Sequence, residues 1–344
     1  MLFDIHPKEN RGDMYDREKE LESLYNSLKQ NERLVIIYGV RRTGKTSLMH
    51  VFLNQRHAMY VLLDLKQVYF DQGYVPQKAL ANLIANDFVK LSESMRIETG
   101  IDPDEELNLT ELLKDINDIC KSKKLKFVLS LDEAQYLRFG GSTRYDGIIA
   151  WAVDNLSNIM IMLTGSEIGM LKDFLRYDDS KAPLYGRFRN EVYLNRFEKE
   201  ESMDFLRKGF LESGKDITKD ELEDTVDNLD GIVGWLTYYG HYRTVGKLSK
   251  KEALEKVLEE GRKIANDELE GLIFRSRKRY LAILSAMASG PRRWSDIKAY
   301  TYSKTGKITD AKLTEMLHSL IKFGVVEKKD EFYSIIDPIV KYSL

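Results

Sequence analysis

The sequence predicts an α/β fold in which a parallel five-stranded sheet, with helices on both faces, is followed by a helical domain and a small C-terminal domain. Three observations predict it. Short apolar runs alternate with helical patterns in residues 1–198, helical patterns alone occupy residues 199–272, and three helices with a hairpin occupy residues 273–344. Strands that alternate with helices are typical of a parallel sheet with helical crossovers. These ranges are the three expected domains.

Four short apolar runs and a fifth segment at residues 191–194 are the expected strands of the sheet. Charge on one side and Gly39 on the other bound the first run, and near-continuous apolar runs are typical of strands buried on both faces. Between them lie segments whose apolar residues recur every three or four positions, as in amphipathic helices. The strands are expected at residues 34–38, 59–65, 126–131, 159–163 and 191–194, and the helices at 15–30, 46–53, 78–95, 107–122 and 148–156.

The pattern changes twice beyond the expected sheet. Helical periodicity without strand signals is typical of a small helical domain, and three helices followed by a hairpin is the order of a winged helix-turn-helix. Gly324 is expected to end the last of these helices. The helices are expected at residues 199–213, 219–229, 233–245, 250–272, 276–288, 294–300 and 309–323, and the hairpin at 325–336.

Composition indicates a globular protein. Of its 344 residues, 43% are hydrophobic and 31% are charged, and its one cysteine, Cys120, excludes an intrachain disulfide framework. A chain with a single cysteine suits a reducing cytoplasm. The first residues carry no apolar signal core, and no apolar run approaches the roughly 20 residues of a membrane helix. We therefore expect a cytoplasmic protein with no membrane partner.

The formal net charge of −2 divides unevenly along the chain. Residues 271–344 contain 14 lysines and arginines against 7 acidic residues, a net charge of +7, whereas the remainder contains 39 against 48, a net charge of −9. A basic module can attract nucleic acid, and it can equally be a soluble surface. Composition alone leaves both interpretations open.

Residues 39–46 carry the first chemical motif, Gly-x4-Gly-Lys-Thr. It follows an expected strand and opens an expected helix, which is the context of a phosphate-binding loop. Its glycines let backbone N–H groups turn toward phosphate oxygens, and the helix N-terminus adds the positive end of its dipole. Lys45 is placed to neutralise the β- and γ-phosphates, and the Thr46 hydroxyl to ligate Mg²⁺. The expected nucleotide-binding residues of the loop are Gly39, Val40, Arg41, Arg42, Thr43, Gly44, Lys45, Thr46 and Ser47.

The second motif places Asp132 and Glu133 at the carboxyl end of the third expected strand. Ligands of open α/β sheets bind at that edge. Asp132 can hold the Mg²⁺ hydration shell, and Glu133 can orient and activate the attacking water. A glutamate directly after the aspartate favours hydrolysis over phosphoryl transfer by a small-molecule kinase.

Polar residues also end the fourth expected strand and follow it. Thr164 and Ser166 would lie between the loop strand and the acid-bearing strand, where they could report the γ-phosphate or simply cap a turn. Arg187 could stabilise transition-state charge, in cis or from a neighbouring molecule, or form a surface salt bridge. Arg41 and Arg42 are expected to make a salt bridge or a contact at the rim of the loop.

Four segments together make the chain resemble the archaeal ATPase family, which belongs to the signal-transduction ATPases with numerous domains, relatives of the AAA+ class. The resemblance covers about residues 12–245 and implies ATP with Mg²⁺, a helical lid and a nucleotide-controlled switch. Tyr15 and Arg17 resemble the family's N-terminal Arg-Glu box, which lies near the adenine. Gly234-Trp235 departs from the Gly-x-Pro that the lid often has. The four segments are residues 38–46, 131–135, 163–166 and 183–187.

Two functions follow from these motifs. The first is an ATP-hydrolysing, Mg²⁺-dependent switch that binds ATP and ADP and has a winged-helix output module. The alternative is a DNA-binding ATPase of origin-recognition or transposition type, in which hydrolysis controls the engagement of duplex DNA. A protein partner for the winged helix, and an oligomer, stay open. The lysines that favour DNA are Lys304, Lys307, Lys312 and Lys322 near the expected recognition helix, and Lys328 and Lys329 at the wing.

Overall fold

Five strands form a parallel sheet in the order β2-β3-β4-β1-β5. The computed structural model describes residues 1–55, 57–273, 276–342 and 344. All five expected strands are present, and β4 lies between the loop strand β1 and the acid-bearing strand β3, as expected. The strands are β1 Leu34–Tyr38, β2 Met59–Asp64, β3 Phe127–Asp132, β4 Ile159–Gly165 and β5 Asn190–Tyr193.

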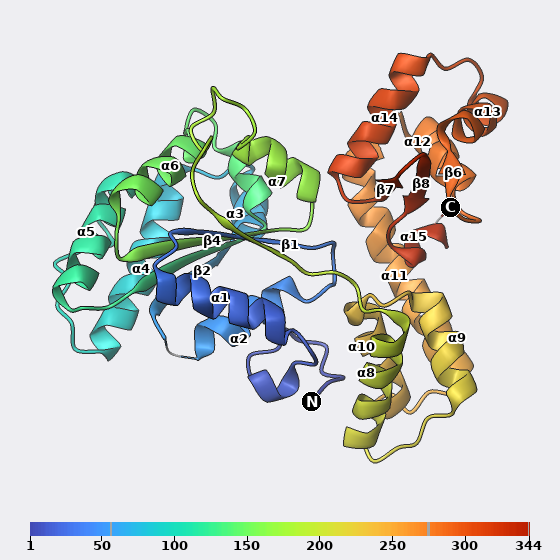
Figure 1. The fold of residues 1–344 in the computed structure, drawn as a ribbon, viewed down its shortest axis with the longest axis horizontal. Helices are drawn as coiled ribbons and strands as arrows, with labels where there is room; N and C mark the ends of the chain where they lie inside the picture. The colour runs from blue at the N-terminus through green and yellow to red at the C-terminus, as the bar shows by residue number, and fades with distance from the viewer. Residues whose placement is uncertain (56, 274–275, 343) are drawn as a thin grey trace.

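Helices cover both faces of this sheet (Figure 1). The short helices α3, η2 and α7 directly follow β2, β3 and β4, at the carboxyl edge, and were not predicted from the sequence. The helices of this part are η1 Arg11–Asp13, α1 Glu18–Gln30, α2 Lys45–Asn54, α3 Leu65–Gln72, α4 Gln77–Ser94, α5 Leu109–Ser122, η2 Ala134–Phe139, α6 Tyr145–Asn155 and α7 Ile168–Leu175.

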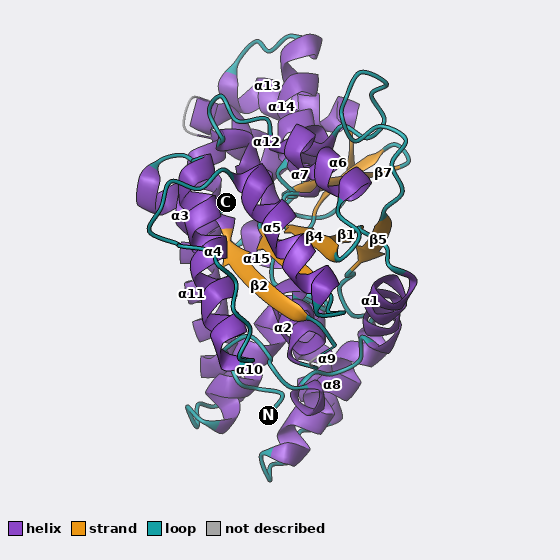
Figure 2. Cartoon of the chain, turned by 90° about the vertical axis from the view of Figure 1, so that its left-hand side faces the viewer, coloured by secondary structure: helices purple, strands orange, loops and turns teal. Residues whose placement is uncertain are grey.

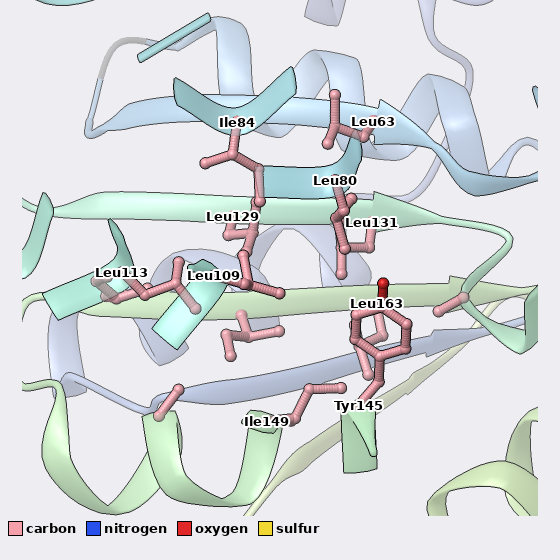
Figure 3. Packing of buried hydrophobic residues seen from close by; sticks show 14 of the residues in the cluster. Leu63, Leu80, Ile84, Leu109, Leu113, Leu129, Leu131, Tyr145, Ile149 and Leu163 are labelled. Atoms are coloured by element: carbon pink, nitrogen blue, oxygen red, sulfur yellow. The ribbon is translucent and has the colours of Figure 1, made fainter. Parts of the chain in front are cut away.

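Two hydrophobic cores lie on the two faces of the sheet. Alternate residues of a strand point to opposite faces, so Ile36 joins the larger core with α4, α5 and α6, whereas its neighbour Ile37 packs with α1 and α2. Figure 3 shows the larger core, where Leu131 and Leu163 of the strands meet Tyr145 of α6. This two-sided burial explains why β1 to β4 consist of near-continuous apolar runs.

Four helices form the lid, and the last of them also enters the C-terminal domain. Ala253 and Val257 of α11 are buried in the lid core, and Ala265 and Leu269 are buried in the core of the C-terminal domain. One continuous helix therefore belongs to both hydrophobic cores, and the domain boundary near residue 272 stays a prediction. The lid helices are α8 Lys199–Glu212, α9 Lys219–Leu229, α10 Val233–Thr244 and α11 Lys250–Ile273.

The described residues of the C-terminal domain form four helices, α12 to α15, and a small antiparallel sheet in the order β6-β8-β7. The short strand β6 and the last helix, α15, were not expected. Figure 2, turned by 90° from Figure 1, shows α12, α13 and α14 grouped at one end of the molecule. The elements are α12 Arg277–Ala286, β6 Arg292–Arg293, α13 Trp294–Thr305, α14 Asp310–Lys322, β7 Val326–Lys329, β8 Phe332–Ile335 and α15 Pro338–Lys341.

The C-terminal domain packs back onto the sheet domain through α14 and α7. Lys322 at the end of α14 forms an ion pair of 2.6 Å with Asp173 of α7. Gly169 of α7 lies so close that a Cβ there would stand 2.6 Å from the Cα of Lys322. No helix within the described ranges is long and apolar enough to span a membrane.

Candidate active site

The loop between β1 and α2 has the backbone that its glycines require. Gly44 has a φ of +93° and is the N-cap of α2. A Cβ at Gly39 would stand 2.8 Å from both the carbonyl oxygen of Leu194 and the hydroxyl of Thr43. Gly44 therefore supplies the left-handed backbone conformation that the loop needs, and Gly39 leaves room for Leu194 and Thr43 because it has no side chain. The loop and the first turn of α2 line a cavity of about 300 Å³.

Lys45 is buried at the base of this cavity. Its Nζ donates hydrogen bonds to the carbonyl oxygens of Gly39 at 2.8 Å and Val40 at 3.0 Å. Burial lowers the pKa of this ammonium, and the carboxylates of Glu133 and Asp132 oppose that effect. The loop thus holds a cation beside the helix N-terminus, the arrangement that binds a phosphate chain.

Asp132 lies between two hydroxyls. Thr46 Oγ1 donates to its Oδ2 at 2.8 Å, and Thr164 Oγ1 donates to its Oδ1. Burial and the charge of Glu133 raise the pKa of Asp132, against the effect of these hydrogen bonds. A hydroxyl and a carboxylate oxygen are ligands that suit Mg²⁺, and their spacing is close to the roughly 2.9 Å between neighbouring ligands of an octahedral ion at 2.0–2.1 Å. Thr46 and Asp132 therefore fit the metal role expected of them.

Glu133 is fixed by three donors from two segments. Its Oε2 accepts hydrogen bonds from the Ser166 hydroxyl at 2.7 Å, the Ser166 N–H at 3.2 Å and Gln135 Nε2 at 2.5 Å. Burial by itself would raise the pKa of Glu133, but the ammonium of Lys45 and these hydrogen bonds outweigh it and lower the pKa. Glu133 is therefore a carboxylate at neutral pH.

The two hydroxyls at the end of β4 each serve one acid, Thr164 for Asp132 and Ser166 for Glu133. They lie at the carboxyl edge with the loop, as expected, and their role toward the γ-phosphate stays a prediction. The sequence did not predict Gln135 as a partner of Glu133. Its place two residues after the acid, within the family-like segment, was the signal that could have identified it.

The two arginines of the loop reach the lid and α11. Arg41 pairs with Glu167 after β4 at 2.9 Å and with Glu268 of α11 at 2.6 Å. Arg42 stacks on the ring of Trp235, with its Cζ 4.0 Å from the ring centroid. The expected salt bridge and rim contact are both present, and these partners are Glu167, Glu268 and Trp235 rather than Asp132 or Glu133.

The start of α10 rests directly on the loop. The N–H of Gly234 donates to the carbonyl oxygen of Arg42 at 3.0 Å, and a Cβ at Gly234 would stand 2.8 Å from the Cβ of Arg42. Val233, Gly234, Thr237 and Tyr238 line the cavity. Gly234 is therefore the point at which the lid contacts the loop.

Tyr15 and Arg17 lie on the same cavity, on the side of the lid. The Tyr15 hydroxyl donates to Asp204 of α8 at 2.8 Å, and Arg17 donates to the carbonyl oxygen of Asn195 at 2.6 Å. The structure thus brings both residues to the loop. The sequence did not predict Leu2, residues 4–8, Lys66, Tyr136 and Glu268, which also line the cavity.

Arg187 lies elsewhere, at the opposite edge of the sheet. It precedes β5, whose first residue pairs with Val35 at the start of β1, whereas the loop follows the end of β1. Its guanidinium binds Asp154 at the end of α6, with Nε 3.0 Å from Oδ1. The structure therefore does not bring Arg187 to the phosphate cavity of its own chain, and the alternative of a salt bridge is correct. A role from a neighbouring molecule stays a prediction.

A parallel sheet, a phosphate-binding loop and an adjacent aspartate–glutamate pair define a P-loop ATPase with a helical lid. The chain belongs to the family described as the ATPase domain predominantly from Archaea, whose model matches residues 14–238. The model of the MCM protein C-terminal winged helix-turn-helix domain matches residues 274–336. These matches confirm the predicted family, the ATPase activity and the winged helix.

Solved structures resemble the chain over nearly its whole length. The Walker-type ATPase PABY2304 of Pyrococcus abyssi is 37% identical, with a TM-score of 0.91 over 100% of this chain and 99% of that one. The ORC2 protein of Aeropyrum pernix, in its ADPNP–ADP complexes, shares the fold with a TM-score of 0.65 at 17% identity, over 98% of this chain and 93% of that one. No curated protein matches the chain.

Proposed function

We propose that this ATPase is a Mg²⁺-dependent molecular switch whose lid and winged helix change position with the bound nucleotide. The observation that carries the proposal is the pair of loop arginines. Arg41 pairs with Glu268 on the helix that enters the winged-helix core, and Arg42 stacks on Trp235 of the lid. A change in the loop on nucleotide binding would therefore act directly on both modules.

A second contact extends this path to the end of the chain. The indole N–H of Trp235 donates to both carboxylate oxygens of Asp337, at 3.1 and 3.0 Å. Asp337 in turn caps α15 by accepting the N–H of Ile339 at 2.9 Å. The ring on which Arg42 stacks is thus tied to the helix that closes the C-terminal domain, and this link supports coupling between loop and output.

The roles of the site residues follow from their chemistry. The Lys45 ammonium would bind the β- and γ-phosphates and stabilise the charge that develops during transfer. Glu133, an ionised carboxylate beside it, would orient a water and accept its proton. Thr46 and Asp132 would hold Mg²⁺, which would neutralise phosphate charge. Thr164 and Ser166 would keep the two acids in place.

Measurements of ATP hydrolysis and of nucleotide binding test the catalytic assignment. Turnover of wild type is expected to require Mg²⁺, Lys45→Ala is expected to lose nucleotide binding, and Glu133→Gln is expected to bind ATP but to turn over about 10²–10⁴ times more slowly. The exposed Glu105→Gln is the matched control for the second change. Equal rates in all proteins would contradict the assignment.

Hydrogen exchange tests the switch itself. In Glu133→Gln, which is expected to retain ATP, amide protection of α10 and α15 should differ between the ATP-bound and nucleotide-free protein. The far helix α5 serves as the internal control because it makes no contact with the loop arginines. Unchanged protection in α10 and α15, with ATP demonstrably bound, would refute the switch while leaving the ATPase in place.

DNA binding by the winged helix is the second candidate function. The net charge of +7 in residues 271–344 favours it, and Lys304, Lys307, Lys328 and Lys329 are exposed in this domain. Lys322, expected to serve the same surface, is instead paired with Asp173 of α7. Fluorescence anisotropy with a random duplex at low salt tests this candidate. Absence of binding even there would favour a protein partner.

A further inference from the structure

We propose that residues 2–9 form a clamp over the nucleoside part of the bound nucleotide, and that the seating of Phe3 in the lid sets the rate of nucleotide release. This inference rests on ATP binding at the loop. Leu2 and residues 4–8 of this segment, called the N-terminal clamp below, line the cavity together with the loop and α10. Figures 1 and 2 both place the start of the chain beside α8 and α10.

One end of the clamp is fixed in the lid by Phe3. A Cβ at Gly209 of α8 would stand 2.3 Å from Cζ of Phe3, and a Cβ at Gly240 of α10 would stand 2.3 Å from its Cδ1. The ring also meets Phe205 and Phe210 edge-on, with centroids 5.8 and 5.4 Å away. Two helices thus present glycine at the two places where any other side chain would exclude the ring. Phe3 therefore occupies a slot shaped for it.

The other end of the clamp is fixed to α2. The N–H of Lys8 donates to the hydroxyl of Ser47 at 3.0 Å, and Asn54 Nδ2 donates to the carbonyl oxygen of Glu9 at 3.2 Å. Ser47 lies two residues after the loop lysine, so this end is attached to the phosphate site itself. The clamp consequently spans the cavity from the lid to the loop helix.

The middle of the clamp presents apolar and ring surface to the cavity. Ile5, His6 and Pro7 line it between the two anchors. Asp4 holds the turn, since its Oδ1 accepts the backbone N–H of His6 at 3.0 Å and lies 2.9 Å from the His6 ring nitrogen. The loop takes the phosphates, so this surface faces the base and ribose, opposite Val233 and Thr237 of α10. A flat base between two apolar walls is the expected ligand chemistry.

The two anchors predict where the energetic barrier to exchange lies. A bound nucleoside can leave when the clamp detaches from the lid or when the lid moves from the loop, and the first route requires Phe3 to leave its slot. Loosening Phe3 should therefore accelerate release without changing the phosphate chemistry, because affinity differences between related complexes arise mainly in the dissociation rate.

Stopped-flow displacement of a fluorescent ADP analogue tests this proposal. Phe3→Ala, which empties the slot, and Gly240→Ala, which fills it, are both expected to release the analogue about tenfold faster or more than wild type. Phe3→Leu should restore much of the slow release. Phe188→Ala, at a 70% exposed phenylalanine outside the cavity, is the matched control and should behave as wild type.

A second readout separates the clamp from the catalytic groups. Single-turnover hydrolysis of saturating ATP by Phe3→Ala should keep the wild-type rate constant. If the slot variants fail to fold, Ile5→Asp tests the proposal instead. Ile5 is 45% exposed, and an aspartate there would place a charge against the apolar base, so this variant should also accelerate release. Wild-type release rates in the folded slot variants or in Ile5→Asp would overturn the proposal. Failure of wild type to bind the analogue at all would instead contradict the nucleotide site.

Discussion

Ser166 positions Glu133, and its removal should affect turnover more than binding. The hydroxyl donates to Glu133 Oε2 at 2.7 Å and helps to lower the pKa of that carboxyl. We expect Ser166→Ala to reduce kcat about tenfold to hundredfold with little change in nucleotide affinity. The acid limb of the pH–rate profile should also move to higher pH, because loss of a hydrogen bond to the ionised form raises the pKa of Glu133. Steady-state hydrolysis between about pH 3 and 8 measures both effects.

The exposed Ser122 at the end of α5 supplies the control for this experiment. Its hydroxyl bonds only to a carbonyl oxygen of its own helix, that of Ile119, so Ser122→Ala should keep the wild-type kcat and pH profile. A Ser166→Ala protein with an unchanged acid limb would show that Glu133 is positioned without this hydroxyl.

At the scale of single residues, the sequence identified the groups whose spacing along the chain is local. The loop from Gly39 to Thr46 and the Asp132-Glu133 pair each lie within one strand–turn unit, so the motif and the site coincide. Arg187 lies away from the phosphate cavity of its own chain because it precedes β5, and the amino end of a parallel strand lies at the edge of the sheet opposite the loop. Glu268 was missed because an acid on a charged helix has no local signal for the loop that it meets.

Among the elements, α10 is held against the loop by the absence of a side chain at Gly234. The substitution Gly234→Ala would place a Cβ 2.8 Å from the Cβ of Arg42 and 3.2 Å from its carbonyl oxygen. We expect the start of α10 to move away from the loop, with a stability loss of about 1–3 kcal/mol and weaker ATP binding. Thermal unfolding and a nucleotide titration measure the two effects. Gly147→Ala within α6, where the nearest atom lies 3.8 Å away, should be neutral or slightly stabilising.

The lid depends on a buried ion pair between α9 and α10. Arg243 donates to Glu221 at 2.7 and 3.2 Å, and the Tyr239 hydroxyl donates to it at 2.7 Å. Burial would raise the pKa of Glu221, but these partners outweigh it and lower the pKa below 4.5. The stabilisation that ionised Glu221 contributes is fully present above the pKa of this glutamate in the unfolded chain. It is lost as the pH falls through the lower pKa of Glu221 in the folded protein.

Glu221→Gln should therefore destabilise the protein by about 3 kcal/mol at pH 7, since it leaves the Arg243 charge without its partner. The difference from wild type should shrink as the pH falls below 4.5. Denaturant unfolding at pH 7 and at an acidic pH below the ordinary range of a glutamate measures it. The control is Glu223→Gln, at a half-exposed residue paired with Lys219 on the surface of the same helix. It should change the free energy of unfolding by at most about 1 kcal/mol. A constant difference across this pH range would contradict the role of the charge.

The sequence predicted long and periodic elements better than short ones. Strands β1 to β4 each carried a near-continuous apolar run, but α3 and α7 have only eight residues each and begin at or just after strand ends. Asp64 explains the first case: its carboxylate accepts the N–H groups of Lys66 and Gln67 at 2.8 and 3.3 Å, which starts a helix where the strand was expected to continue. The sequence does not reveal such a cap, because it can be recognised only when the backbone is seen to turn from strand into helix at Asp64.

At the scale of the whole molecule, α11 connects the modules that the proposed switch would move. Its first half is buried in the lid and its second half in the winged helix, so in the proposed switch a displacement of one would be transmitted along a continuous helix to the other. The winged helix is in turn docked on α7 through Lys322 and Gly169. Nucleotide-dependent movement of α11 would consequently strain or release the contact between α14 and α7.

The exposed lysines at the wing provide the last prediction, which concerns the second candidate function. Lys328 and Lys329 end β7, where they are exposed and line a cavity with Gly169 and Lys172 of α7. If they bind phosphates, Lys328→Ala/Lys329→Ala should weaken binding of duplexes of any sequence and reduce the slope of log K against log[salt] by about 2, near 1 for each phosphate that is no longer neutralised. The lysine pair at the end of α5, Lys123→Ala/Lys124→Ala, removes the same charge at the opposite end of the molecule (Figure 1). Equal salt slopes in the two double variants would show that the wing does not bind DNA, because a change in net charge alone would affect both alike.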